Sequence, residues 1–173
     1  MEPSKGYENY PIRIVLLSNI VSLGIDALGF FIILRLGLVY SLIYLFYLII
    51  LEYRLMKSGC ISCYYWGKRC AFGKGKLSSY LFKKGDTKRF CAKEMTWKDM
   101  IPDIMVSLIP LSVGIILLII NFDLVLLIAI LLLVLLTTSG NGYVRGTLAC
   151  NNCKQKETGC PAYMLFNKNK KSD

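Results

Sequence analysis

The sequence predicts an all-α membrane protein with four transmembrane helices. They form two hairpins related by internal duplication, each followed by a small irregular cysteine-rich lobe. The chain has 173 residues, of which 55% are hydrophobic, and its apolar residues concentrate in two stretches, 12–53 and 101–138. A single helix of about 40 residues would reach roughly 60 Å, about twice the thickness of the hydrocarbon core of a bilayer. Each stretch must therefore fold back and cross the membrane twice.

Short polar segments mark where each stretch turns. Arg35-Leu36-Gly37 divides the first stretch and Asn121-Phe122-Asp123 the second, and both contain residues that suit tight turns. The expected spans are residues 12–34, 39–51, 104–120 and 124–137. A span usually needs about 20 residues, so we expect interfacial tyrosines or local bilayer thinning to compensate for the shorter ones. The first apolar run lacks a small-residue cleavage pattern and leads into a second span, so we expect it to be retained.

Positive charge lies almost entirely outside the apolar stretches. Residues 54–100 hold 12 Lys/Arg against three acids, a net +9, and residues 139–173 hold six against two, a net +4. Residues 1–53 and 101–138 carry −1 and −2, which brings the chain to its net charge of +10. Lys and Arg favour the cytoplasmic flanks of membrane spans, so both basic lobes and both termini are expected in the cytoplasm. The four segments are the predicted divisions of the chain.

The seven cysteines follow a repeated spacing. Cys60-x2-Cys63-x6-Cys70 follows the first apolar stretch, Cys150-x2-Cys153-x6-Cys160 follows the second, and Cys91 stands alone. Each trio is followed by a Leu-Phe pair, at 81–82 and at 165–166. This pattern predicts two repeats about a pseudo-two-fold axis along the membrane normal, with the two trios facing each other at the membrane surface.

Soft thiolates at fixed spacing are typical metal ligands. The chain has no histidine, which excludes mixed Cys/His zinc sites, His-ligated haem and Rieske ligation. Cytosolic thiols stay reduced and the odd number of cysteines argues against full pairing, so a disulfide framework is disfavoured. The predicted occupants are one or two iron–sulfur clusters of the 4Fe–4S type, with zinc as the alternative and free or redox-active thiols as the third reading.

All seven cysteines are candidate metal ligands. Cys60, Cys63, Cys70 and Cys91 could complete one four-thiolate site, leaving Cys150, Cys153 and Cys160 with an open fourth position. Alternatively, Cys91 joins the second trio and leaves the first site open. Basic residues surround both trios and are expected to lower the thiol pKa or to meet anionic lipid headgroups. These are Lys57, Lys68, Arg69, Lys74 and Lys76 near the first trio, and Arg145, Lys154 and Lys156 near the second.

Several other residues are candidates for a functional or a packing role. Tyr64, Tyr65 and Trp66 lie between ligands and either screen a cluster from water or sit at the membrane interface. Asp26 lies inside the first span, where a carboxylate is a candidate for a proton or ion path. With no second intramembrane acid and no basic partner at helical spacing, the favoured expectation is that it reaches Arg35 or water. A packing face is the expected role of Tyr40, Tyr44 and Tyr47, and packing also accounts for Pro110 and Gly114.

The second trio carries a resemblance to known proteins. Residues 146–162, GTLACNNCKQKETGCPA, resemble a group of small prokaryotic membrane proteins of uncharacterised function, found in anaerobes that include methanogenic archaea. The resemblance extends less closely to residues 59–73. It implies a cysteine-rich module beside membrane spans and an anaerobic host, and it supplies no known reaction.

These patterns favour a multi-pass protein of the cell membrane that is not an enzyme. The first expectation is an accessory protein with a redox- or oxygen-responsive metal module. It is expected to dock onto a larger integral membrane complex, with an energy-conserving complex of an anaerobe as the candidate. The alternatives are an iron–sulfur electron-transfer protein and a zinc-stapled membrane scaffold. Anionic lipid headgroups are the second expected partner, whereas the basic segments lack any recognition fold for nucleic acid.

Overall fold

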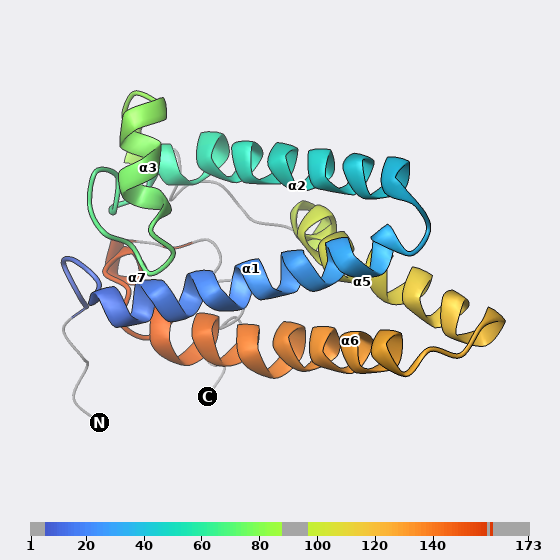
Figure 1. Cartoon of the computed structure of the whole chain (residues 1–173). Coiled ribbons are helices and arrows are strands. Elements are labelled where there is room, and N and C mark those ends of the chain that lie inside the picture. Colours follow the sequence, from blue (N-terminus) through green and yellow to red (C-terminus); the bar gives the residue numbers. More distant parts are fainter. Residues whose placement is uncertain (1–5, 88–96, 159, 161–173) are drawn as a thin grey trace.

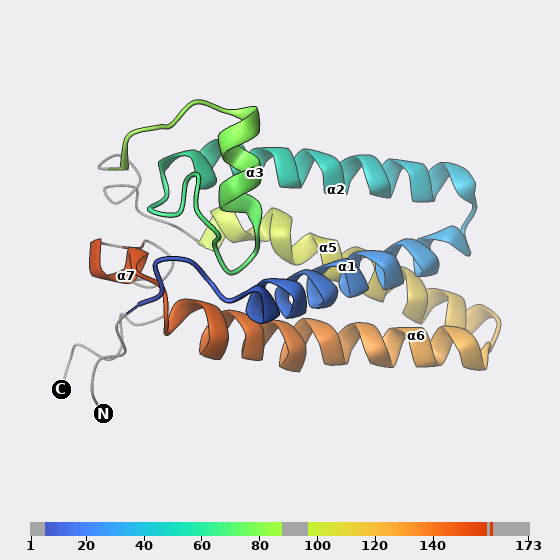
Figure 2. The same cartoon turned by 60° about the vertical axis from the view of Figure 1, so that its left-hand side comes forward.

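The computed structural model describes residues 6–87, 97–158 and 160, and this part of the chain is helical without a β-strand. Four long helices run side by side, and α3 and α7 lie at the end where α1 begins (Figures 1 and 2). The long helices are α1 (Ile12–Leu34), α2 (Leu38–Ser58), α5 (Trp97–Ile120) and α6 (Leu124–Leu135), and the short ones are α3 (Lys74–Leu81) and α7 (Gln155–Thr158). We call the end where α1 begins and α2 ends the thiol end, and the opposite end the turn end.

The four long helices are long and apolar enough to cross a membrane, as the sequence predicts. Their outer surfaces are apolar too: Ile20, Phe46 and Ile119 expose 66%, 65% and 79% of their surface. In water such exposure would cost free energy, whereas against lipid chains it costs none. The coarse fold class, an all-helical protein with four candidate membrane spans, is therefore confirmed.

The prediction of short later spans is wrong. α2 continues to Ser58, α5 begins at Trp97, and α6 is prolonged by π-helical turns over Leu136–Gly140 and Tyr143–Cys150. Polar residues near helix ends do not stop a helix, because long side chains reach water while the backbone bonds stay internal. No mismatch then needs compensation, and Cys60 and Cys150 lie directly at the ends of their helices.

Both predicted turns occur where expected, and they are tied to each other. Gly37 has a φ of 130°, a left-handed conformation that favours glycine. Arg35 Nη1 lies 3.2 Å from Asp123 Oδ2 across the turn end. Asp123 Oδ1 also accepts a hydrogen bond of 2.8 Å from the Val125 N–H and so caps α6. The ion pair is partly exposed and contributes at most about 1 kcal/mol, and it joins the turn of one hairpin to the turn of the other.

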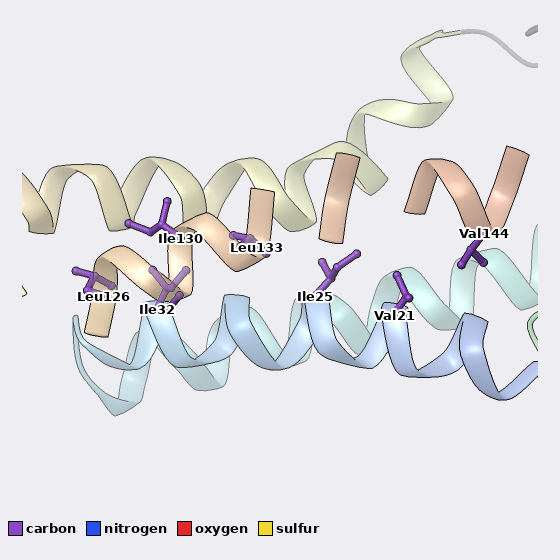
Figure 3. Close-up of a cluster of buried hydrophobic side chains, with 8 residues drawn as sticks. Val21, Ile25, Ile32, Leu126, Ile130, Leu133 and Val144 are labelled. Carbon is purple, nitrogen blue, oxygen red and sulfur yellow. The ribbon is translucent and has the colours of Figure 1, made fainter. Parts of the chain in front are cut away.

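The main core lies between α1 and α6, with α5 packed against it (Figure 3). Its buried members are Val21, Ile25 and Ile32 on α1, Leu126, Ala129, Ile130 and Leu133 on α6, and Val144 beyond it. Gly114 lets α5 approach closely, since a Cβ there would lie 2.8 Å from the Ile130 side chain and 3.2 Å from that of Ile32. Small residues at such crossings bring membrane helices into van der Waals contact.

A second crossing joins α1, α2 and α5 through Tyr44. Its hydroxyl donates a 2.7 Å hydrogen bond to the Val106 carbonyl. Pro110 has no N–H, so that carbonyl lacks its usual helical partner four residues later. Gly29 makes room: a Cβ there would contact the Tyr44 ring and lie 3.3 Å from Pro110 Cγ.

The neighbouring tyrosines share this face to different degrees. The Tyr47 hydroxyl donates to the Pro102 carbonyl at 2.7 Å, while Tyr40 is 58% exposed. The predicted packing face is thus confirmed for Tyr44 and Tyr47.

We predict that Tyr44→Phe destabilises the helix bundle by about 1–2 kcal/mol, because the Val106 carbonyl loses its donor inside the apolar region. Thermal unfolding in a mild detergent measures this. Tyr40→Phe is the matched control, because Tyr40 is exposed on the same helix. Equal stability of the two variants would contradict the role assigned to Tyr44.

Candidate thiol site

The thiol end gathers the described cysteines. Six are free and partly buried: Cys60, Cys63, Cys70, Cys150, Cys153 and Cys160. Cys91 lies outside the described residues. The first trio occupies the loop between α2 and α3. The second trio begins at Cys150, the last residue of the π-helical extension of α6, and both segments lie at the same end of the bundle (Figure 2). The two copies of the cysteine repeat therefore lie together, although they are about 90 residues apart in the sequence.

Cysteines from both trios pack on one small core. Its buried members are Tyr10, Tyr65, Ala71 and Ala149, and the partly buried side chains against them include Cys63, Cys70 and Cys153. The prediction that the trios face each other is therefore consistent with the described residues. The repeat symmetry itself stays a prediction.

Residues just after Cys63 bind residues just after Cys153. The Tyr64 N–H donates to Gln155 Oε1 at 2.6 Å, and Gln155 is only 2% exposed. The Lys154 N–H donates to the Tyr65 hydroxyl at 3.1 Å. These bonds hold the two cysteine loops against each other independently of any metal.

The N-terminal segment 6–10 lies across this junction, which the sequence analysis did not anticipate. The Tyr7 N–H donates to the Asn152 carbonyl at 2.9 Å, and the Tyr65 hydroxyl donates to the Tyr7 carbonyl at 2.5 Å. Tyr10 spans the two loops: its N–H donates to the Arg69 carbonyl at 3.0 Å and its hydroxyl to the Ala149 carbonyl at 2.5 Å. In the sequence, this N-terminal segment could be recognised by the motif Tyr-Glu-Asn-Tyr-Pro just before the first span.

The first cysteine loop is built tightly. The Gly75 N–H donates to Cys70 Sγ at 3.2 Å, and a Cβ on Gly75 would lie 2.8 Å from the Lys68 carbonyl oxygen. Gly67 and Gly73 have φ values of 75° and 71°, which favour glycine. An N–H directed at sulfur is a common outer-shell contact of thiolate ligands, so this feature suits a ligand role for Cys70.

The expectation that basic side chains lower the thiol pKa is wrong for Cys63 and Cys153. Burial raises the pKa of Cys63 to about 12, and the nearby thiols of Cys153, Cys60 and Cys70 add to the rise. Burial also raises the pKa of Cys153, and the thiol of Cys160 adds to the rise. Both thiols are therefore neutral at physiological pH unless a metal binds them.

The basic side chains are engaged elsewhere. Lys68 Nζ lies 4.4 Å from the centre of the Tyr64 ring, and Lys154 Nζ lies 2.8 Å from Glu8 Oε1. The Arg145 guanidinium stacks on Phe72 at 5.4 Å. With these charges partly engaged, burial dominates the pKa of Cys63 and of Cys153.

The chemistry of the thiols suits a soft metal, but their positions do not enclose one. Within residues 6–87, 97–158 and 160, no three cysteine or carboxylate side chains come close enough together to hold a metal ion. The assignment of all seven cysteines as ligands stays a prediction, and for Cys91 it concerns a residue outside the described chain. Ligation by both trios would require their loops to move.

Asp26 does not pair with Arg35, which binds Asp123 instead. It faces a polar cavity near the thiol end together with Glu52 and Lys74. The expectation of no second intramembrane acid is therefore wrong, because Glu52 lies within the candidate span Leu38–Ser62. The sequence of the first span itself still offers no basic partner at helical spacing. These neighbours come from other helices, so spacing along one helix could not reveal them.

Comparisons with protein-family models, with curated proteins and with solved structures find no match to this chain. The resemblance of residues 146–162 therefore stays a prediction. Function must be argued from the thiol end and from the helices that carry it.

We predict that Tyr65→Phe speeds maleimide labelling of Cys63 and Cys153 several-fold, because the loss of its hydroxyl breaks the bonds to Tyr7 and Lys154. Labelling rates at each site are measured by mass spectrometry in detergent at one pH. Tyr80→Phe is the control, since Tyr80 is 78% exposed. Unchanged rates in Tyr65→Phe would show that the junction does not protect the thiols.

Proposed function

We propose that the protein is a non-catalytic membrane accessory protein whose thiol end responds to metal or redox state. The observation that carries this proposal is that Cys63, Cys70 and Cys153, from both trios, pack on one buried core. Thiols kept free and partly buried in one place are suited to bind a soft metal or to change oxidation state together.

The position of the thiols explains how such a state could be transmitted. Cys60 follows the end of α2, and Cys150 ends the π-helical extension of α6. A group ligated by thiols of both loops would fix those two helix ends relative to each other. Because metal ligation then adds to the folding free energy of the loops, loss of the metal would loosen the same helix ends.

One or two iron–sulfur clusters, of the 4Fe–4S type, are the proposed occupants. Four thiolates are the usual ligands of such clusters, and the hydrogen bond to Cys70 Sγ is of the kind that tunes them. Zinc is the alternative, in which case the same thiols would act as a structural staple between the loops.

The thiol end is proposed to face the cytoplasm, because the basic segments 54–100 and 139–173 leave the membrane there. The two hairpins would then be parallel repeats.

Labelling of intact cells tests which side of the membrane the thiol end faces. An impermeant maleimide should react with a cysteine introduced by Asn121→Cys at the turn end and should miss one introduced by Tyr80→Cys. The reverse pattern would invert the topology.

We predict that anaerobically purified protein contains iron and acid-labile sulfide in equal amounts and absorbs visible light through thiolate-to-iron charge transfer. Cys63→Ser and Cys153→Ser should lose most of the iron, whereas Ser79→Ala, a change in the neighbouring helix α3, should keep it. Zinc in place of iron would favour the alternative in which zinc holds the two cysteine loops together. Protein free of both metals, with intact thiols, would refute the metal site.

The accessory role predicts a partner. The basic thiol end should attract anionic lipid headgroups and an acidic cytoplasmic surface of a larger membrane complex. We predict co-purification with such a complex under anaerobic conditions and at low salt. Air or high salt should weaken it, because oxidation alters the thiol end and salt screens the charges. Isolation as a free monomer under all these conditions would contradict the accessory role.

A further inference from the structure

A polar cavity of about 120 Å³ opens among α1, α2, α5 and the π-helical turns that follow α6. Charged groups from five segments line it: Asp26 on α1, Glu52 on α2, Lys74 on α3, Asp103 on α5 and Arg145 in Tyr143–Cys150. This volume is large enough for several water molecules, since one needs about 10–15 Å³. Neither the thiols nor the proposed metal accounts for this cavity.

Asp26 is the deepest charged group in the cavity. It lies about 12 Å along α1 from Leu34 and about 21 Å from Ile12, at about 1.5 Å per residue. This places it well inside the span, where a carboxylate is costly unless a cation, a proton or water accompanies it.

The charges around Asp26 do not neutralise it. Glu52 and Lys74 form a salt bridge with each other at 2.5 Å. Arg145 is held away by a 2.8 Å hydrogen bond from its Nε to Asn141 Oδ1. Asp103 lies at the exposed rim, and among the described residues neither it nor Asp26 forms a salt bridge.

The other groups near Asp26 do not supply positive charge. The Tyr44 hydroxyl, the remaining titratable group nearby, donates to the Val106 carbonyl. Apart from the Glu52–Lys74 pair, the charged groups that line the cavity are the carboxylates of Asp26 and Asp103 and the guanidinium of Arg145.

One polar group in the wall of the cavity lacks a hydrogen-bond partner among the described residues. The Thr137 hydroxyl oxygen is buried, lines the cavity and has no hydrogen-bond partner in the described part of the chain. A buried hydroxyl is rarely left unsatisfied in a folded protein.

We propose that this cavity binds a small monovalent cation, a proton or an alkali ion, with Asp26 as its principal ligand. The cation neutralises a carboxylate that no side chain pairs.

Carbodiimide labelling of the full-length protein in liposomes tests the proposal, because the reagent modifies protonated carboxyl groups in apolar surroundings. Mass spectrometry should locate the product on Asp26, with a yield that rises as the pH falls and no product at that site in Asp26→Asn. Asp123 is the internal control, since Arg35 pairs with it at the turn end. Protection by sodium but not by choline would identify an alkali ion as a second occupant, and pH dependence alone would identify the proton.

Lys74→Gln provides a charge test of the same site. It leaves Glu52 unneutralised beside Asp26, so Asp26 should hold its proton more tightly and the labelling midpoint should move to higher pH. Lys76→Gln, an exposed position on the same helix, should leave the midpoint unchanged. No label on Asp26, equal label on Asp123, or a midpoint that Lys74→Gln does not move would overturn the proposal.

Discussion

The hydroxyl of Tyr65 connects three segments that are distant in sequence. It donates to the Tyr7 carbonyl and accepts from the Lys154 N–H, so the N-terminal segment 6–10 and both cysteine loops meet at one atom. The ring is 2% exposed, and a buried hydroxyl with both partners is costly to disturb. The arrangement of the thiols depends on this junction, because it fixes the residues that follow Cys63 and Cys153.

The membrane imposes the other constraint, that backbone groups must be paired inside the bundle. Pro110 breaks this rule locally, and Tyr44 from a neighbouring helix restores it. At the turn end, Arg35 and Asp123 join the two hairpins in a similar way, one side chain from each. The bundle is therefore held together at its middle and at both ends, and the cysteines of the described residues lie at the thiol end.

Local patterns were enough to predict some of these features. The span Ile12–Leu34 and both turns follow from apolar runs and from turn residues, which act on the nearest neighbours in sequence. The remaining features depend on contacts between distant segments. The partners of Tyr10, the polar neighbours of Asp26 and the raised pKa of Cys63 arise only when separate helices meet. The later helices are longer than predicted because polar residues, such as Glu52 on α2 and Asn141 beyond α6, lie within helical segments rather than at their ends.

The central claim is that the two cysteine repeats form one site, and cross-linking tests it most directly. A short bifunctional thiol reagent, applied to reduced protein in detergent, should join Cys63 to Cys153 within one chain, as mass spectrometry of the digested product would show. The yield should fall in Tyr65→Phe and not in Tyr80→Phe. Cross-links found only within each trio, with none between Cys63 and Cys153, would contradict the account.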